Sequence, residues 1–221
     1  AWLRRRVFSS AAVMPYRGVA ACPGRPSGQH RIWLKKGLIS PATTMSVNVS
    51  VRQLGMPGFA ARVEAILKKH CMRPDSLILE ITESAMVETI ETDIIHHLKR
   101  LGVQISLDDF GTGYSSLATL QTFTFDKNKI DCSFVKDLHL DRRRAAIVRS
   151  TLSLGGAFGI PVQAEGVETE DELIFLAAEG CDFVQGIHFG KPISLSATRT
   201  LVMDQDMDTA SRPPFERRNC A

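Results

Sequence analysis

No run of apolar residues in this 221-residue sequence approaches the roughly 18 residues that a membrane-spanning helix requires. Cys-x-x-Cys pairs and Cys/His clusters at zinc spacing are also missing, and the five cysteines are scattered. These absences argue against a membrane segment in this chain, a disulfide framework and a structural zinc site. We therefore expect reduced thiols and a cytoplasmic location, although upstream domains of a longer parent protein could attach it to a membrane.

Acidic residues are missing from residues 1–44, which contain eight of the 27 Lys and Arg. The rest of the chain therefore has 19 basic and 24 acidic residues, so it is mildly acidic and not suited to binding bulk nucleic acid. Residues 1–44 also show no helix or strand periodicity. A transit peptide or a nucleic-acid arm would fit this composition. We favour a leader that is not native domain sequence, arising from the point where the chain begins or from a shifted reading frame.

From Met45 onward, short apolar runs alternate with helical patterns. Strands are predicted at residues 46–51, 77–81, 103–107, 129–135, 160–164 and 183–185. Helices are predicted at residues 57–70, 86–101, 141–154 and 169–180, with a last one from about Ser194. Six strand–helix units without a hairpin signal require a parallel sheet. The pattern alone allows an open doubly wound sheet or a (β/α)₈ barrel of the TIM type.

A polar residue lies at or near the end of each predicted strand. These residues are Asn48, Glu80 followed by Glu83, Asp108 with Asp109, Lys129 with Asp131, Glu165 and Gln185. Any one of them has an ordinary explanation as a helix cap or a loop residue. In a parallel barrel, however, all strand carboxyl ends meet at one mouth, whereas the outer strands of an open sheet end far apart. Six in a row therefore favour the barrel.

Such a mouth would bring together four carboxylates, those of Glu80, Asp108, Asp109 and Glu165. They cannot all stay ionised at close range without a compensating cation. Oxygen-only ligands favour Mg²⁺ or Mn²⁺, and adjacent aspartates can ligate two ions, the arrangement used for phosphodiester hydrolysis. Lys129 would supply a fixed positive charge for the phosphate or the attacking hydroxide.

Six segments of the chain, in order, resemble the EAL family of cyclic-di-GMP phosphodiesterases, which are (β/α)₈ barrels. They are Ser-Val-Asn-Val-Ser (46–50), Leu-Glu-Ile-Thr-Glu-Ser (79–84), Asp-Asp-Phe-Gly-Thr-Gly-Tyr-Ser-Ser-Leu (108–117), Lys-Ile-Asp-Cys-Ser-Phe-Val (129–135), Ala-Glu-Gly-Val-Glu-Thr (164–169) and Val-Gln-Gly (184–186). The resemblance covers about residues 45–195. We therefore predict a partial barrel domain over residues 45–204 and a polar tail over residues 205–221.

The resemblance also implies roles for individual residues. The metal ligands would be Asn48, Glu80, Asp108, Asp109 and Glu165. Glu165, Lys129 and Gln185 would be the catalytic set, with Lys129 and Gln185 positioning the hydrolytic water. Glu83 would anchor a loop that orders the metal site and takes part in homodimer contacts in the family. This loop is formed by Phe110, Gly111, Thr112, Gly113, Tyr114, Ser115 and Ser116.

One departure from the family concerns its Glu-x-Leu motif, whose glutamate completes the metal site. By family spacing this motif would precede residue 1, so we expect a barrel that lacks its first two strands and binds metal weakly. The implied function is metal-dependent hydrolysis of cyclic di-GMP to linear pGpG, in a chain that truncation could inactivate. The alternatives are an impaired module that binds cyclic di-GMP or a protein partner, and a non-functional gene remnant.

Overall fold

The computed structural model describes residues 30–32, 34–35, 44–83, 92–111 and 123–191. Most of the predicted leader and all of the predicted polar tail at residues 205–221 lie outside these residues, and so do three other predicted features. They are the first part of the helix at residues 86–101, the helix from Ser194, and the loop residues Thr112, Gly113, Tyr114, Ser115 and Ser116.

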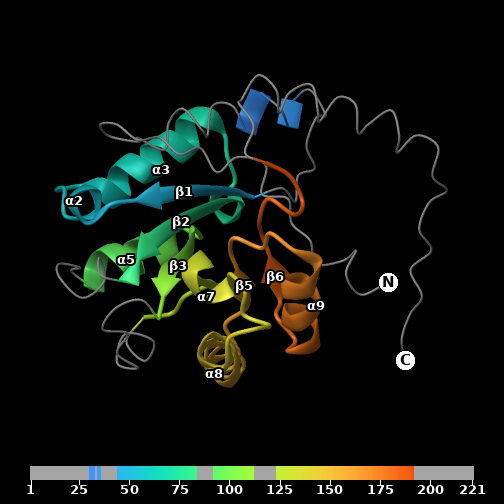
Figure 1. The fold of residues 1–221 in the computed structure, drawn as a ribbon. Coiled ribbons are helices and arrows are strands. Elements are labelled where there is room, and N and C mark those ends of the chain that lie inside the picture. Colours follow the sequence, from blue (N-terminus) through green and yellow to red (C-terminus); the bar gives the residue numbers. More distant parts are fainter. Residues whose placement is uncertain (1–29, 33, 36–43, 84–91, 112–122, 192–221) are drawn as a thin grey trace, which may run out of the picture.

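In the described residues, six parallel strands form a single sheet in the order β1-β2-β3-β4-β5-β6 (Figure 1). The strands are β1 (Met45–Val49), β2 (Leu77–Thr82), β3 (Gln104–Phe110), β4 (Lys127–Ile130), β5 (Val162–Ala164) and β6 (Phe183–Val184). Each strand pairs with its neighbour in sequence, which is the order of a (β/α) barrel and not the reversing order of a doubly wound sheet. The predicted barrel-type α/β fold is confirmed. Within the described residues the sheet is open between β1 and β6.

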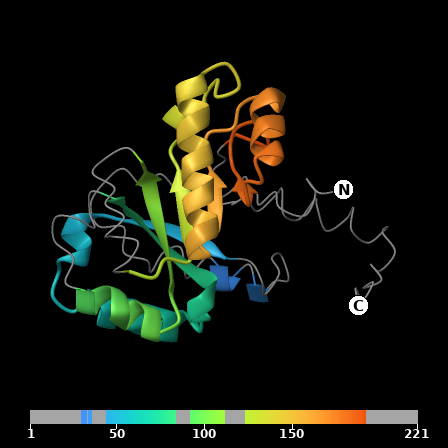
Figure 2. The same ribbon diagram turned by 90° about the horizontal axis from the view of Figure 1, so that it is seen from below.

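The longer helices lie on the outer side of the sheet and follow it around its curve, and two helices of four residues directly follow the ends of β1 and β4 (Figures 1 and 2). They are α2 (Val51–Leu54), α3 (Phe59–His70), α5 (Thr92–Arg100), α7 (Cys132–Val135), α8 (Arg142–Phe158) and α9 (Glu170–Ala178), with a 3₁₀ turn, η2, at Pro74–Ser76. Asp141 caps α8 by accepting from the backbone of Arg143 and Arg144, as its position predicted. None of the described helices is long and apolar enough to cross a membrane.

The core has two parts, one on each half of the sheet. Leu79, Ile81 and Leu98 belong to the part between β1–β3 and helices α3 and α5. Ile130 and Leu176 belong to the part between β4–β6 and helices α8 and α9. Both halves bury apolar side chains between the sheet and its helices. The polar residues at the strand ends lie instead at the mouth of the barrel.

The fourth strand exists, but its predicted bounds, residues 129–135, were wrong. Strand β4 ends at Ile130, and the apolar residues that follow form helix α7. The reason is a helix cap: the side chain of Asp131 accepts a hydrogen bond from the backbone nitrogen of Ser133 at 2.9 Å. This cap fixes a helical turn where the apolar pattern alone had suggested an extended chain.

A helical turn also occurs within the predicted leader, where we expected no regular structure. Residues 30–32 and 34–35 are helical, and His30 is buried. The Nη1 atom of Arg31 donates to the carbonyl of Lys69, near the end of α3, at 3.2 Å. This turn is therefore in contact with the barrel.

Candidate active site

Lys129 lies among three carboxylates at the carboxyl ends of the strands. Its Nζ atom is 2.7 Å from Oε1 of Glu165, 3.0 Å from Oε2 of Glu80 and 3.1 Å from Oδ1 of Asp108. Lys129 is 3% exposed and Glu80 is 6% exposed. The four residues come from β4, β2, β3 and the position after β5, so the order of the strands alone brings them together.

The electrostatics of this cluster are unbalanced, since one ammonium faces three carboxylates. Burial alone would lower the pKa of Lys129, but the charges of Glu80, Glu165 and Asp108 outweigh it and raise the pKa, so Lys129 stays protonated. Burial also raises the pKa of Glu165 to about 7, in spite of its contact with Lys129, and Asp108 and Glu80 add to this rise. The cluster is therefore short of positive charge.

Asp109 follows Asp108 in an unusual backbone conformation, with a φ of 57°. The pairing of β3 with β4 shifts register between Leu107 and Phe110, which indicates a bulge at the two aspartates. Burial raises the pKa of Asp109, and the charges of Asp108 and Asp131 raise it further. A positive φ in a residue other than glycine costs about 1 kcal/mol or more and is often found at functional sites.

Glu83 connects the cluster to the start of the predicted loop. It is 2% exposed, and its Oε2 atom accepts a hydrogen bond from the backbone nitrogen of Gly111 at 3.2 Å. Gly111 has a φ of 93°, which favours glycine there. Phe110, which precedes it, is buried in the core. The structure thus gives Glu83 a contact of the kind expected for a loop anchor.

Asn48 and Gln185 lie at the two sides of the cluster. Asn48 is exposed and pairs in register with Glu80. Gln185 follows β6, and its Oε1 atom accepts a hydrogen bond from Nε2 of Gln163 at 2.9 Å. The structure therefore groups Glu80, Asp108 and Glu165 directly around one lysine and places these two predicted residues at its borders.

No three His, Cys, Asp or Glu side chains form a ready-made metal site in the part of the chain that the structure describes. The carboxylates are instead arranged around the ammonium of Lys129. The binding of a metal by this set of residues therefore remains a prediction.

Lys127 and Gln163 are polar residues near the site that the sequence reasoning missed. The Nζ atom of Lys127 donates to Oε1 of Gln163 at 3.1 Å and lies 4.9 Å from the ring centroid of Phe183. Two signals could have revealed them. Lys127 is two positions before Lys129 and so shares its face of β4, and Gln163 interrupts an otherwise apolar buried strand.

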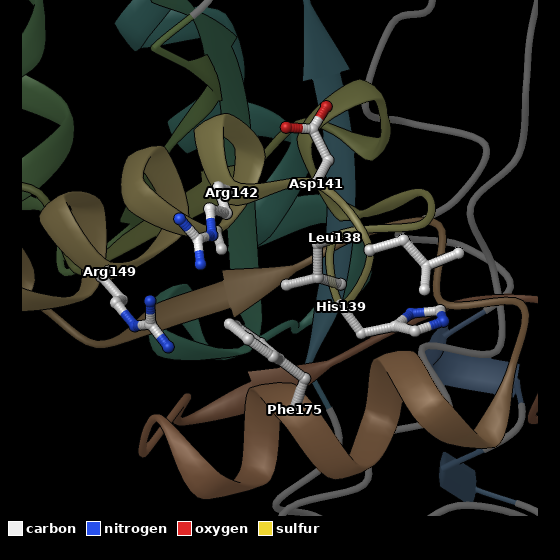
Figure 3. Close-up of a pocket in the computed structure, with 8 residues that line it drawn as sticks. Leu138, His139, Asp141, Arg142, Arg149 and Phe175 are labelled. Carbon is white, nitrogen blue, oxygen red and sulfur yellow. The ribbon is translucent and has the colours of Figure 1, made fainter.

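A separate cavity of about 420 Å³ lies on the outside of the barrel, between the start of α8 and helix α9 (Figure 3). It is lined by Leu138, His139, Leu140, Asp141, Arg142, Ala145, Arg149 and Phe175. Arg149 lies over the ring of Phe175 and forms an ion pair with Glu179 at 2.7 Å. None of the lining residues belongs to the carboxylate cluster, so this cavity is a different feature of the molecule.

Comparison with known protein families gives one match over most of the chain. The family model described as the EAL domain matches residues 28–192. This match begins inside the predicted leader and extends close to the end of the predicted barrel. The boundaries at residues 44 and 204 therefore stay predictions.

Several solved structures are similar to this chain. The EAL domain of Mycobacterium smegmatis DcpA is 37% identical with a TM-score of 0.74, covering 80% of each chain. PaMucR phosphodiesterase, solved as a complex with c-di-GMP, is 37% identical with a TM-score of 0.73, covering 79% of this chain and 70% of that one. Klebsiella pneumoniae BlrP1, solved with manganese and c-di-GMP, is 29% identical with a TM-score of 0.67, covering 79% of this chain and 46% of that one.

Curated relatives are considerably longer than this chain. An uncharacterized signaling protein of Caulobacter vibrioides is 48% identical over 69% of this chain and 19% of its own length. Cyclic di-GMP phosphodiesterase NbdA of Pseudomonas aeruginosa is 35% identical over 80% of this chain and 23% of its own length. The chain thus spans about a fifth to a quarter of the length of these relatives.

Proposed function

Since the chain belongs to the EAL domain family, we propose that it is a metal-dependent phosphodiesterase that hydrolyses cyclic di-GMP to linear pGpG. The proposal rests on the cluster of Glu80, Asp108 and Glu165 around Lys129 at the mouth of the barrel. Similar proteins support it, because NbdA is named as a cyclic di-GMP phosphodiesterase and PaMucR was solved with c-di-GMP bound.

The composition of the cluster fits divalent ions. Its side chains offer oxygen donors, and its carboxylates outnumber the single buried ammonium, which leaves negative charge for a cation to neutralise. The proposed ligands of Mg²⁺ or Mn²⁺ are Asn48, Glu80, Asp108, Asp109 and Glu165. BlrP1, a similar protein, was solved with manganese. Ions held there would supply Lewis-acid activation for phosphodiester hydrolysis.

The other residues of the proposed site would bind the phosphate, orient the attacking water or hold the loop in place. Lys129 places a fixed positive charge where a phosphate would enter, and its ammonium can donate to a phosphate oxygen or to the attacking water. Gln185 offers a side-chain amide at the neighbouring strand end. Glu83 holds the backbone of Gly111 and so fixes the first residues of the loop beside Asp108. A homodimer formed with this loop, and a cytoplasmic location, remain predictions.

Chromatographic detection of pGpG tests this function. We expect at most slow conversion of cyclic di-GMP in the presence of Mn²⁺ or Mg²⁺, because the glutamate of the Glu-x-Leu motif is absent from this sequence, and we expect EDTA to stop the reaction. Glu165→Gln and Lys129→Met should each abolish turnover. Arg149→Ala, which removes a charged side chain from the outer cavity, serves as the control and should retain full activity. Equal turnover in Glu165→Gln and the unsubstituted chain would overturn the assignment of the site.

Binding of cyclic di-GMP without turnover is the second candidate function. It is favoured by the position of Lys129, whose ammonium lies among the proposed ligands in the described structure. Calorimetric titration with cyclic di-GMP in Ca²⁺ separates the two functions. Micromolar binding together with no pGpG formation in Mn²⁺ would favour the binding module, whereas pGpG formation would exclude it.

A further inference from the structure

Three polar side chains form a continuous row of hydrogen bonds next to the carboxylate cluster. Lys127 donates to Gln163 at 3.1 Å, and Gln163 donates to Gln185 at 2.9 Å. They come from β4, β5 and the residue after β6, which are neighbouring strands. Gln163, in the middle of the row, is 7% exposed, whereas Lys127 and Gln185 are partly exposed. Lys127 and Gln163 lie outside the sequence segments that resemble the EAL family.

The direction of these hydrogen bonds follows from the chemistry of the first residue. An ammonium group only donates, so Lys127 must face the oxygen of the Gln163 amide and not its nitrogen. The Gln163 nitrogen, which also only donates, is then turned toward the oxygen of Gln185. This leaves the Nε2 group of Gln185 as the part of that amide turned away from Gln163. One cation thus sets the orientation of two amides in series.

The surroundings of Lys127 hold this cation in place. The pKa of Lys127 is lowered, chiefly by burial and also by the charge of Lys129, while the charges of Glu80 and Glu165 oppose this shift. The ring of Phe183 lies 4.9 Å from its Nζ atom, close enough for a cation–π contact. The start of the row is therefore held by the hydrogen bond to Gln163 and by packing against Phe183.

We propose that Lys127 and Gln163 are positioning residues that make Gln185 present its Nε2 donors, and not its Oε1 acceptor, at the mouth of the barrel. The proposal rests on the function proposed above, in which Gln185 orients the attacking water or a phosphate oxygen. Both of those oxygens can accept a hydrogen bond from Nε2. A reversed amide would instead present an acceptor to the phosphate, which has no proton to donate.

Two substitutions alter the row in different ways. Gln163→Glu keeps the size of the side chain and still accepts from Lys127, but its carboxylate cannot donate to Gln185. The Gln185 amide should then reverse, with its Nε2 facing residue 163. Lys127→Met removes the cation and keeps an apolar side chain against Phe183. Lys68→Met, which replaces an exposed lysine of α3 that pairs with Glu64, is the matched control.

Nuclear magnetic resonance of the full chain tests the row without requiring any activity. The side-chain amide signals of Gln185 are identified by their loss in Gln185→Ala. We expect Gln163→Glu and Lys127→Met to shift these signals, and Lys68→Met to leave them in place. Unchanged Gln185 signals in Gln163→Glu would overturn the proposal, whether or not the chain hydrolyses cyclic di-GMP.

A double-mutant cycle on hydrolysis tests the consequence. We expect Gln163→Glu to lower kcat at least about tenfold, the scale expected when an oriented hydrogen-bond donor is lost, and to change KM less. In a Gln185→Ala background the same substitution should have no further effect, because its target is gone. Additive losses would overturn the proposal. If the unsubstituted chain forms no pGpG, the proposed function fails, while the amide signals still decide whether the row exists.

Discussion

The ammonium nitrogen of Lys129 and the Oε1 atom of Glu165 lie 2.7 Å apart, although 36 residues of sequence separate them. Parallel pairing of β4 with β5 creates this proximity, because Ile130 and Ala164 are partners and each is adjacent to one member of the pair. The contact is therefore built into the register of the sheet and does not depend on a flexible loop. Substitutions of Lys129 or Glu165 should therefore change the charge of the site more than they change the fold.

Removing the lysine should leave the carboxylates without their buried counter-charge. We expect Lys129→Met to lower the free energy of unfolding of the metal-free chain by about 3 kcal/mol, the scale for breaking a buried ion pair. Mn²⁺ should restore part of this stability if Glu80, Asp108 and Glu165 bind it, since a ligand of the folded state stabilises it. Thermal unfolding with and without Mn²⁺ measures both effects. A substituted chain as stable as the original would contradict the electrostatic account.

The anchoring of the loop by Glu83 can be tested with a pair of substitutions. Glu83→Gln keeps an oxygen that can accept from the backbone nitrogen of Gly111, whereas Glu83→Met removes it. Loss of the acceptor leaves a partly buried donor unpaired, which costs about 1–3 kcal/mol. We expect Glu83→Met to reduce hydrolysis of cyclic di-GMP more than Glu83→Gln does. Activity and thermal unfolding of the two variants, measured together, would show whether the loss is local, and equal activity would argue against anchoring.

Adjacent glycines in α8 offer a test of how closely this helix packs on the barrel. A Cβ atom on Gly155 would lie 2.3 Å from Cγ2 of Val162 and 2.8 Å from the carbonyl oxygen of Ile160, whereas one on Gly156 would meet nothing within 4 Å. We therefore expect Gly155→Ala to destabilise the fold by about 1–3 kcal/mol through overpacking.

Gly156→Ala should stabilise the fold by up to about 1 kcal/mol, because alanine favours the helix. Urea unfolding of both variants checks the contrast. The same sign of effect at both positions would contradict the packing of α8 on β5.

The barrel-type fold could be predicted because it depends on local patterns that recur along the chain. Mainly apolar runs such as residues 77–81, followed by helical patterns, indicate strand–helix units, and the carboxyl ends of parallel strands converge by geometry. For this reason the sequence alone is enough to expect Glu80, Asp108 and Glu165 near one another. Strand β4 was mispredicted because the cap at Asp131 is a single side-chain contact that apolar periodicity does not register.

The sequence has signals that point to Lys127 and Gln163 as residues, but the hydrogen bonds that join them to Gln185 could not be predicted, for a different reason. Its members are far apart in sequence, and their contact depends on the register between β4, β5 and β6. A shift of one residue in either pairing would turn Gln163 to the opposite face of the sheet. The contacts of Lys129 could not be predicted either. The sequence indicates that charged residues converge, but not which carboxylate oxygens the ammonium of Lys129 contacts.

The last prediction concerns pH and a carboxylate outside the candidate active site. Glu172 is 1% exposed and accepts hydrogen bonds from the backbone nitrogens of Asp137 at 2.9 Å, Glu168 at 2.8 Å and Thr169 at 3.0 Å. Burial raises its pKa, but these three donors together outweigh burial, so the pKa in the folded chain lies below the ordinary value of 4.5. Asp137 has a φ of 54°, so Glu172 also holds a strained turn before α8.

Because the folded pKa of Glu172 is below its unfolded pKa, its charge contributes stability that is fully present above pH 4.5 and is lost as the pH falls through the folded pKa. Glu172→Gln should therefore destabilise the chain at pH 7 by about 1–3 kcal/mol, the scale for hydrogen bonds to a charged acceptor. This difference should shrink as the pH falls below 4.5, since protonation removes the same charge from the original side chain. Urea unfolding of both chains from pH 7 to pH 3 measures it, with Glu64→Gln, at a partly exposed glutamate that pairs with Lys68, as the control that should show little change. A destabilisation of constant size over this range would mean that Glu172 acts through packing and not through its charge.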